Sequence, residues 1–288
     1  MGSTSAEALL ASAEKKASST GGWFSSSSSK HEQSIELFKA AANKFRVDNR
    51  LDEAGRALVR AAEMEVRTGE KDFAASTYFE ASKCFRLSNP PQAVNAIGRC
   101  SDILVERGRF RQAADRQKNL AEVYREDPNT LDRAFAAYDQ AATWYTQEGA
   151  SATASACMRE AAQIAIQLSN FPRAIELWEA VAATSLGSSL TKYSVKEFYL
   201  NAGLCYLAIP DTGAAMRAMA YYAQQDPGFP TTTEGQFLHG LLGATEHGDL
   251  QEFDARVAEF DRMKPVSGWR ATLLHGIRNK VAAEPDLS

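Results

Sequence analysis

The sequence has no hydrophobic run that could cross a membrane and no excess of either charge. Its apolar stretches fall short of the roughly 18 residues that a spanning helix needs, and its N-terminus lacks the basic and then apolar order of a signal peptide. Lys and Arg number 32 against 36 Asp and Glu, a formal net charge of −4, so we expect no nucleic-acid partner. These absences favour a packed cytoplasmic protein.

Cysteine and histidine are too few and too scattered for a catalytic or metal-binding motif. The four cysteines lie in separate apolar stretches, where a free thiol behaves as a small hydrophobe: Cys84, Cys100, Cys157 and Cys205. No histidine stands at metal-ligand spacing, and no nucleophile has a recognisable setting. Gly21-Gly22 precedes aromatic residues, without the lysine of a phosphate-binding loop. We therefore expect no enzyme, no metal and no cofactor.

What the chain does contain is a repeat of 20 residues. Small residues recur at this spacing inside apolar stretches, and a valine continues the register: Ala41, Ala61, Ala81, Ser101, Ala121, Ala141, Ala161 and Val181. One helical turn later, on the same face, come the larger residues Phe45, Phe85, Val105 and Tyr145. Turn signals such as Thr68-Gly69, Arg107-Gly108 and Glu148-Gly149 separate the units. Each unit is therefore one amphipathic helix.

Paired helices with small residues at fixed positions are similar to tetratricopeptide arrays, although two helices here take 40 residues instead of 34. We predict an all-α protein, a tetratricopeptide-like right-handed helical solenoid of paired helices capped by a C-terminal helical bundle. The predicted organisation is an N-terminal helix and aromatic loop over 1–30, the repeat array over 31–186 and the C-terminal bundle with its tail over 187–288. An irregular Ala-rich bundle is the alternative.

Two large aromatic residues, Trp23 and Phe24, stand between Gly21-Gly22 and the serines 25–29. One interpretation is that both rings pack onto the end of the array. The other is that they form an exposed apolar tip that enters a membrane interface, where aromatic rings are favoured. The flexible small residues on both sides favour the second interpretation.

At this point several motifs together resemble one known family, the alpha class of soluble NSF attachment proteins, and in particular its fungal members. The likeness covers nearly the whole chain and depends on these segments: Ala13-Glu14-Lys15-Lys16, Ala81-x-Lys83-Cys84-Phe85, Gly108-Arg109-Phe110, Ala141-x-x-Trp144-Tyr145, Lys192-Tyr193-Ser194-x-Lys196, Glu259-Phe260, Trp269 and the terminus Glu284-Pro285-Asp286-Leu287-Ser288. The resemblance implies an adaptor without chemistry of its own.

The resemblance implies two protein partners and a membrane surface, with several copies of the chain around one SNARE four-helix bundle. It assigns SNARE contacts to Arg86, Arg109, Arg116, Lys118, Leu190, Lys192 and Lys196. Where the family often has lysines, this chain has Asp115, Ala156 and Glu160, so the basic face is expected to be thinner or shifted, and Arg159 could compensate.

The second implied partner is an NSF-type AAA+ ATPase hexamer, which the C-terminal region would recruit and stimulate. The resemblance assigns this contact to Glu246, Glu284, Asp286 and Leu287. Pro285 departs from the usual run of acids and makes the tail extended. The alternative function is a generic tetratricopeptide-like scaffold that binds a peptide and has no membrane role. Only the adaptor needs the aromatic loop and the acidic, leucine-containing terminus.

Overall fold

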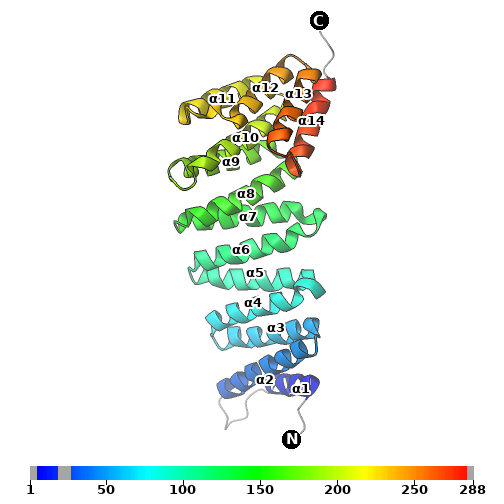
Figure 1. Ribbon diagram of the computed structural model, residues 1–288. Helices are drawn as coiled ribbons and strands as arrows, with labels where there is room; N and C mark the ends of the chain where they lie inside the picture. The colour runs from blue at the N-terminus through cyan, green and yellow to red at the C-terminus, as the bar shows by residue number, and fades with distance from the viewer. Residues whose placement is uncertain (1–4, 19–26, 284–288) are drawn as a thin grey trace. The chain divides into compact units, whose positions relative to one another are not determined.

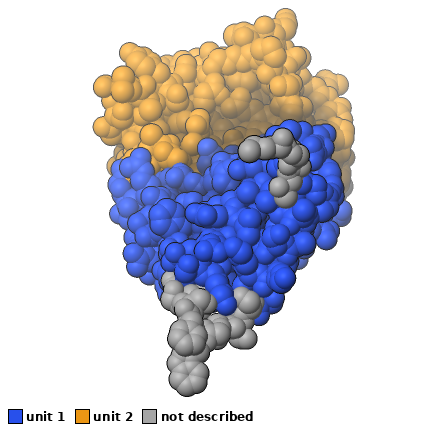
Figure 2. Space-filling model, turned by 90° about the horizontal axis from the view of Figure 1, so that it is seen from below, with its two compact units in different colours: residues 1–149 blue, residues 150–288 orange. Residues whose placement is uncertain are grey.

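The computed structural model describes residues 5–18 and 27–283, and over these residues the predicted all-α fold is confirmed. Fourteen α-helices and three short 3-10 helices make up this part of the chain, which contains no strand. The chain divides into two compact units, unit 1 over residues 1–149 and unit 2 over residues 150–288 (Figure 2). Each unit is described by itself. The predicted boundaries at 30/31 and 186/187 stay a prediction.

Unit 1 is a stack in which each helix packs against the next one along the chain (Figure 1). Its elements are α1 (Ala6–Ser18), α2 (Ser27–Val47), α3 (Leu51–Arg67), α4 (Lys71–Ser88), α5 (Pro90–Glu106), α6 (Phe110–Arg125), the 3-10 helix η1 (Pro128–Thr130) and α7 (Leu131–Gln147). The helix boundaries coincide with the turn signals in the sequence. Pro90 opens α5, where its missing N–H breaks no helical hydrogen bond.

Unit 2 begins with paired helices and continues into a less regular group that packs back on them. Its elements are α8 (Ser151–Gln167), α9 (Phe171–Leu186), η2 (Lys192–Ser194), α10 (Val195–Leu207), α11 (Thr212–Gln225), η3 (Phe229–Thr231), α12 (Thr233–Glu246), α13 (Leu250–Met263) and α14 (Trp269–Ala283). The last helix, α14, contacts α13 and also α8 and α10. This return of the chain covers an apolar face that an open array would leave in water.

The 20-residue register predicted the buried positions correctly. Every small residue of the series is buried, as is Val181. The aromatic residues one turn later, Phe45, Phe85 and Tyr145, are buried too, whereas Val105 is only half-buried. All four cysteines are free and buried, as their apolar neighbours indicated. The structure therefore excludes the alternative of an irregular Ala-rich bundle.

Positive φ angles allow successive helices to reverse direction sharply. Gly69 (φ 85°) follows α3 and Gly108 (φ 68°) follows α5, and both lie in the left-handed region that glycine adopts without strain. After Gly69 the backbone N–H of Glu70 donates to the carbonyl of Glu65 at 2.8 Å. This bond satisfies a carbonyl at the end of the helix and fixes where the next helix begins.

Close helix contact in unit 1 is clearest where Phe85 of α4 lies over Gly55 of α3. A Cβ atom added to Gly55 would lie 2.6 Å from the Phe85 ring. The glycine therefore forms the hollow that the aromatic ring fills, and the two backbones approach more closely than any larger residue would allow.

Candidate functional site

The predicted basic contact residues Arg86, in α4, and Arg109, directly before α6, are both ion-paired. Arg86, near the end of α4, reaches two carboxylates, Glu122 of α6 at 3.6 Å and Glu126, directly after α6, at 3.2 Å. Arg109, directly before α6, reaches Asp72 of α4 at 3.2 Å. An acidic partner must therefore compete with carboxylates of the chain itself for these two arginines.

These ion pairs also show how far apart Arg86 and Arg109 are. Asp72 is in the first turn of α4 and Arg86 in its last, and 14 residues of helix span about 21 Å. The structure therefore places the two arginines at opposite ends of the α4 and α6 layer and does not gather them into one cluster. Arg107, which sequence reasoning missed, also reaches Asp72, at 3.4 Å.

Arg116 and Lys118 both belong to α6 but point to different sides of it, since two residues correspond to 200° around a helix. The Arg116 guanidinium stacks on Phe79 of α4, 3.5 Å from the ring centroid, and its buried Nη1 has no hydrogen-bond partner. Lys118 is half-buried, and no carboxylate within the described ranges pairs with it. Arg116 therefore serves packing as much as charge, whereas the ammonium of Lys118 is available to a partner.

One of the predicted departures from the family pattern has a structural explanation. Asp115 of α6 is half-buried and accepts a hydrogen bond from the hydroxyl of Tyr145 on α7. A lysine at this position would leave that hydroxyl without its acceptor. Ala156 is half-buried in α8 and Arg159 is exposed there, so an exposed basic group does exist beside the missing lysine.

Two of the predicted SNARE contacts in unit 2, Leu190 and Lys192, lie between α9 and α10. Leu190 is 90% exposed and Tyr193 is 86% exposed, and Lys192 between them is exposed as well. Tyr193 was not among the predicted contacts, although it stands inside the quoted motif. No carboxylate of the described residues pairs with Lys192. Together with the two exposed side chains it forms a surface that can bury area and attract an acidic partner at once.

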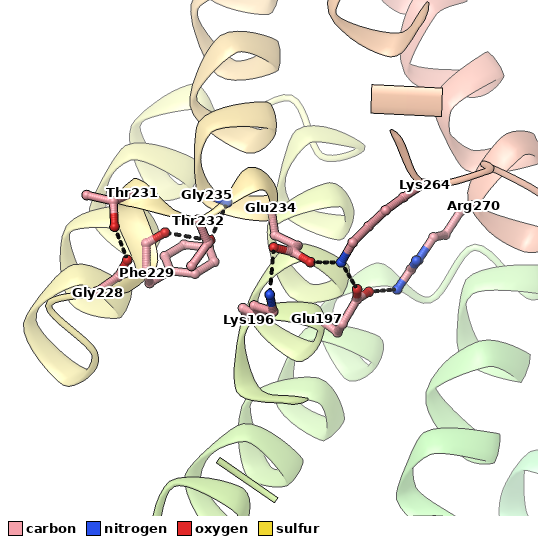
Figure 3. A network of polar contacts seen from close by, with 10 residues as sticks. All are labelled: Lys196, Glu197, Gly228, Phe229, Thr231, Thr232, Glu234, Gly235, Lys264 and Arg270. Atoms are coloured by element: carbon pink, nitrogen blue, oxygen red, sulfur yellow. Dashed lines mark hydrogen bonds and ion pairs between the residues drawn. The ribbon is translucent and has the colours of Figure 1, made fainter. Parts of the chain in front are cut away.

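Lys196, the last predicted basic contact, belongs to a network of charges inside unit 2 (Figure 3). Its Nζ lies 3.6 Å from an oxygen of Glu234, a fully buried residue in the first turn of α12. Lys264, which follows α13, contacts Glu234 and also Glu197, the latter at 2.9 Å. Arg270 of α14 reaches Glu197 at 2.7 Å. The network joins α10, α12 and α14 and fixes the position of Lys196.

Glu197 is the most strongly perturbed carboxylate of this network. Burial alone would raise its pKa, but hydrogen bonds from Lys264 and Arg270 outweigh burial and lower the pKa from 4.5 to about 2. The folded protein therefore keeps Glu197 ionised where the unfolded chain takes up a proton. Its stabilising contribution is complete above about pH 4.5 and is lost as the pH falls toward 2.

Glu246, predicted to contact the second partner, is exposed at the end of α12 and borders a hollow of about 550 Å³ between α11 and α12. The other predicted residues of that contact, Glu284, Asp286 and Leu287, lie outside the described residues, as do Trp23 and Phe24. In the part of the chain that the structure covers, no helix is long and apolar enough to span a membrane, and no cluster of side chains suits a metal ion.

Comparison with known proteins gives one consistent result. The family described as "Soluble NSF attachment protein, SNAP" matches residues 4–282. The chain is 40% identical to the vesicular-fusion protein SEC17 of Coprinopsis cinerea, with 99% of each chain covered. It is 35% identical to a probable vesicular-fusion protein sec17 homolog of Schizosaccharomyces pombe, with 90% of each covered, and 30% identical to the mouse alpha-soluble NSF attachment protein, with 98% of this chain and 96% of the mouse protein covered.

Replacing Glu197 by Gln tests the charge network. We expect the free energy of unfolding at pH 7 to fall by roughly 1–3 kcal/mol, and the difference from the unmodified protein to shrink as the pH falls from 5 to 2. Urea denaturation at several pH values measures this. Glu252→Gln, which removes a half-exposed surface pair with Arg256, is the control and should change stability by less than about 0.5 kcal/mol. An equal loss at pH 7 and pH 2.5 would contradict the electrostatic explanation.

Proposed function

This chain belongs to the soluble NSF attachment protein family, and on that basis we propose that it is a non-enzymatic adaptor in vesicle fusion and intracellular transport. The adaptor binds SNARE complexes and recruits and stimulates an NSF-type AAA+ ATPase, which disassembles them. The match over almost the full length of relatives named as vesicular-fusion and attachment proteins carries this proposal. The proposed location is the cytoplasm, with peripheral association with membranes.

The charges of the described surface suit an acidic helical bundle as partner. Lys118 and Lys192 have no carboxylate partner in the regions described and can attract such a bundle directly. Arg86 and Arg109 are held by half-exposed ion pairs, which contribute only about 0–1 kcal/mol each and so can be exchanged for a partner's carboxylates. Leu190 and Tyr193 add apolar surface that a bound bundle would bury. Several copies of the chain would surround one bundle.

Reversing the charges of Lys118 and Lys192 tests SNARE binding. We expect Lys118→Glu with Lys192→Glu to weaken binding to a purified SNARE four-helix bundle by at least about tenfold at physiological salt, because attraction becomes repulsion across the interface. Binding would be measured by fluorescence anisotropy in detergent solution over a salt series. Higher salt should weaken binding of the unmodified protein and reduce the difference between the two proteins.

The control for net charge is the pair Lys15→Glu and Arg217→Glu, which changes the same number of charges at exposed positions outside the predicted contacts. We expect this control to bind the bundle nearly as well as the unmodified chain. Equal weakening by both double variants would mean that only the overall charge matters, and normal binding by the first would favour the generic scaffold.

The C-terminal residues test the ATPase contact separately from the SNARE contact. We expect Leu287→Ala to reduce stimulation of ATP hydrolysis at saturating SNARE complex by about tenfold or more, since a partner that buries a leucine gains about 1.5–3 kcal/mol. SNARE binding should stay near normal. Leu190→Ala is the matched control, because it removes an exposed leucine of the proposed SNARE surface and should weaken SNARE binding instead. Full stimulation by Leu287→Ala would refute the assignment.

The aromatic pair tests the proposed membrane contact. We expect Trp23→Ser with Phe24→Ser to lower binding to lipid vesicles by at least about tenfold, because two aromatic rings in the interface contribute on the order of a few kcal/mol. Vesicle flotation measures this, and SNARE binding in detergent should not change. Val47→Ser with Leu87→Ser removes two exposed apolar side chains elsewhere in unit 1 and should leave flotation unchanged. Equal loss in vesicles and detergent would favour packing of the rings onto the array.

A further inference from the structure

A hollow in unit 2 lies between α11 and α12, and no residue of the charge network around Glu234 lines it. Its volume is about 550 Å³, and η3 and one arginine of α13 complete its wall. The lining residues on α12 extend from Gly235 to Glu246, and 11 residues of helix span about 16 Å. The hollow is therefore an elongated groove that follows about three turns of α12.

The groove is apolar apart from four residues on α12 and α13. Met216 and Met219 of α11 form one wall, and Phe229 and Pro230 close one end. Met216 is 45% exposed, so this wall faces solvent in the free protein. Methionine side chains are flexible and polarizable and are common on surfaces that accept helices.

One glycine of α12, Gly243, leaves the floor of the groove open, whereas a Cβ atom added to Gly240 would lie 2.9 Å from the side chain of Arg256. Gly240 and Gly243 both line it, and a Cβ atom added to Gly243 would meet no other atom within 4 Å. By contrast, Gly235 is required by the fold, because a Cβ atom there would lie 2.1 Å from the carbonyl oxygen of Phe229. The space above Gly243 is therefore unoccupied by the chain's own side chains and lets another backbone approach α12 closely.

The charge at one end of the groove is negative. Glu246 has no partner among the residues described, and it lies at the C-terminal end of α12, where the helix dipole adds negative potential. Arg256, the only cation lining the groove in the described structure, is already paired with Glu252 at 2.7 Å and Glu259 at 3.5 Å. The edge thus carries more negative than positive charge and favours a basic ligand.

We propose that this groove binds an amphipathic α-helix of a partner protein, with apolar residues at i, i+4 and i+7 in the groove and lysine or arginine beside Glu246. Those three apolar residues span about two turns of helix, so they fit within the three turns of the groove. The volume is larger than one side chain needs, and the open, Met-lined wall suits a helix better than an enclosed small molecule. The groove shares Glu246 with the predicted ATPase contact, but binding of the helix requires neither the SNARE bundle nor the C-terminal tail.

The experiment uses the full chain and a synthetic peptide of about 15 residues, long enough to form a helix. The peptide has leucines at i, i+4 and i+7 and lysines on the other faces, and a second peptide has glutamates in place of the lysines. With the methionine methyl groups labelled with ¹³C, we expect the lysine peptide to shift the NMR signals of Met216 and Met219 but not that of Met64, which is buried in unit 1. The glutamate peptide should bind at least about tenfold more weakly.

Two variants link binding to the groove. Gly243→Leu adds a side chain to the open floor, where an added Cβ atom meets nothing within 4 Å, and should raise the Kd of the lysine peptide at least about tenfold. Gly98→Leu makes the same change in α5, where an added Cβ atom also meets nothing within 4 Å, and should leave the Kd unchanged. Glu246→Gln should weaken binding and make it less dependent on salt.

Three results would overturn the proposal. The first is that neither peptide shifts Met216 and Met219, and the second is that Gly243→Leu binds the lysine peptide as well as Gly98→Leu does. The third is that the free protein associates with itself in light scattering and that Gly243→Leu abolishes this association, because the groove would then belong to a second copy of the chain. A failure of SNARE binding in the earlier experiments would not affect any of these measurements.

Discussion

Close packing of helices through small side chains is the constraint on which the rest of unit 1 depends. An alanine or serine at every twentieth position is buried, and Gly55 lets Phe85 fill the space between α3 and α4. Bulkier residues would push the helices apart and move the side chains that bridge α4 and α6 out of reach of each other. The Arg109 to Asp72 and Arg86 to Glu126 contacts exist because this spacing is short and regular.

The surface that results is only partly free to bind an acidic partner. Some basic groups are paired with carboxylates two helices away along the chain, and Arg116 is committed to the ring of Phe79. Lys118 and Lys192 keep their charge available. Because half-exposed ion pairs contribute little to stability, a partner can take over the paired arginines at low cost in free energy, whereas it cannot easily remove Arg116 from its stacked position. Residues of one charge in one region are therefore not equivalent as contacts.

Unit 2 combines a rigid interior with open surfaces. The buried carboxylate of Glu234 and the half-buried one of Glu197 share Lys264, and this joins helices that are far apart in the sequence. The exposed Leu190 and Tyr193 precede Lys196 and Glu197 of that network in the chain. The groove is lined by α12, which has Glu234 in its first turn. A firm framework of this kind presents exposed apolar side chains in fixed positions, which reduces the entropy that a partner must overcome on binding.

The sequence by itself determined the helical repeat, the helix boundaries and the buried small residues, because these follow from short-range periodicity and from turn residues such as Gly69 and Gly108. It also gave the family likeness, through motifs that are local. Only the tertiary structure decided which charges are free, since the partners of Arg86 and Lys196 lie about 40 residues away in the chain and meet them only when the helices stack. For the same reason the groove at Gly243 has no signal in the sequence, because it forms only where α11, η3, α12 and α13 come together in the fold.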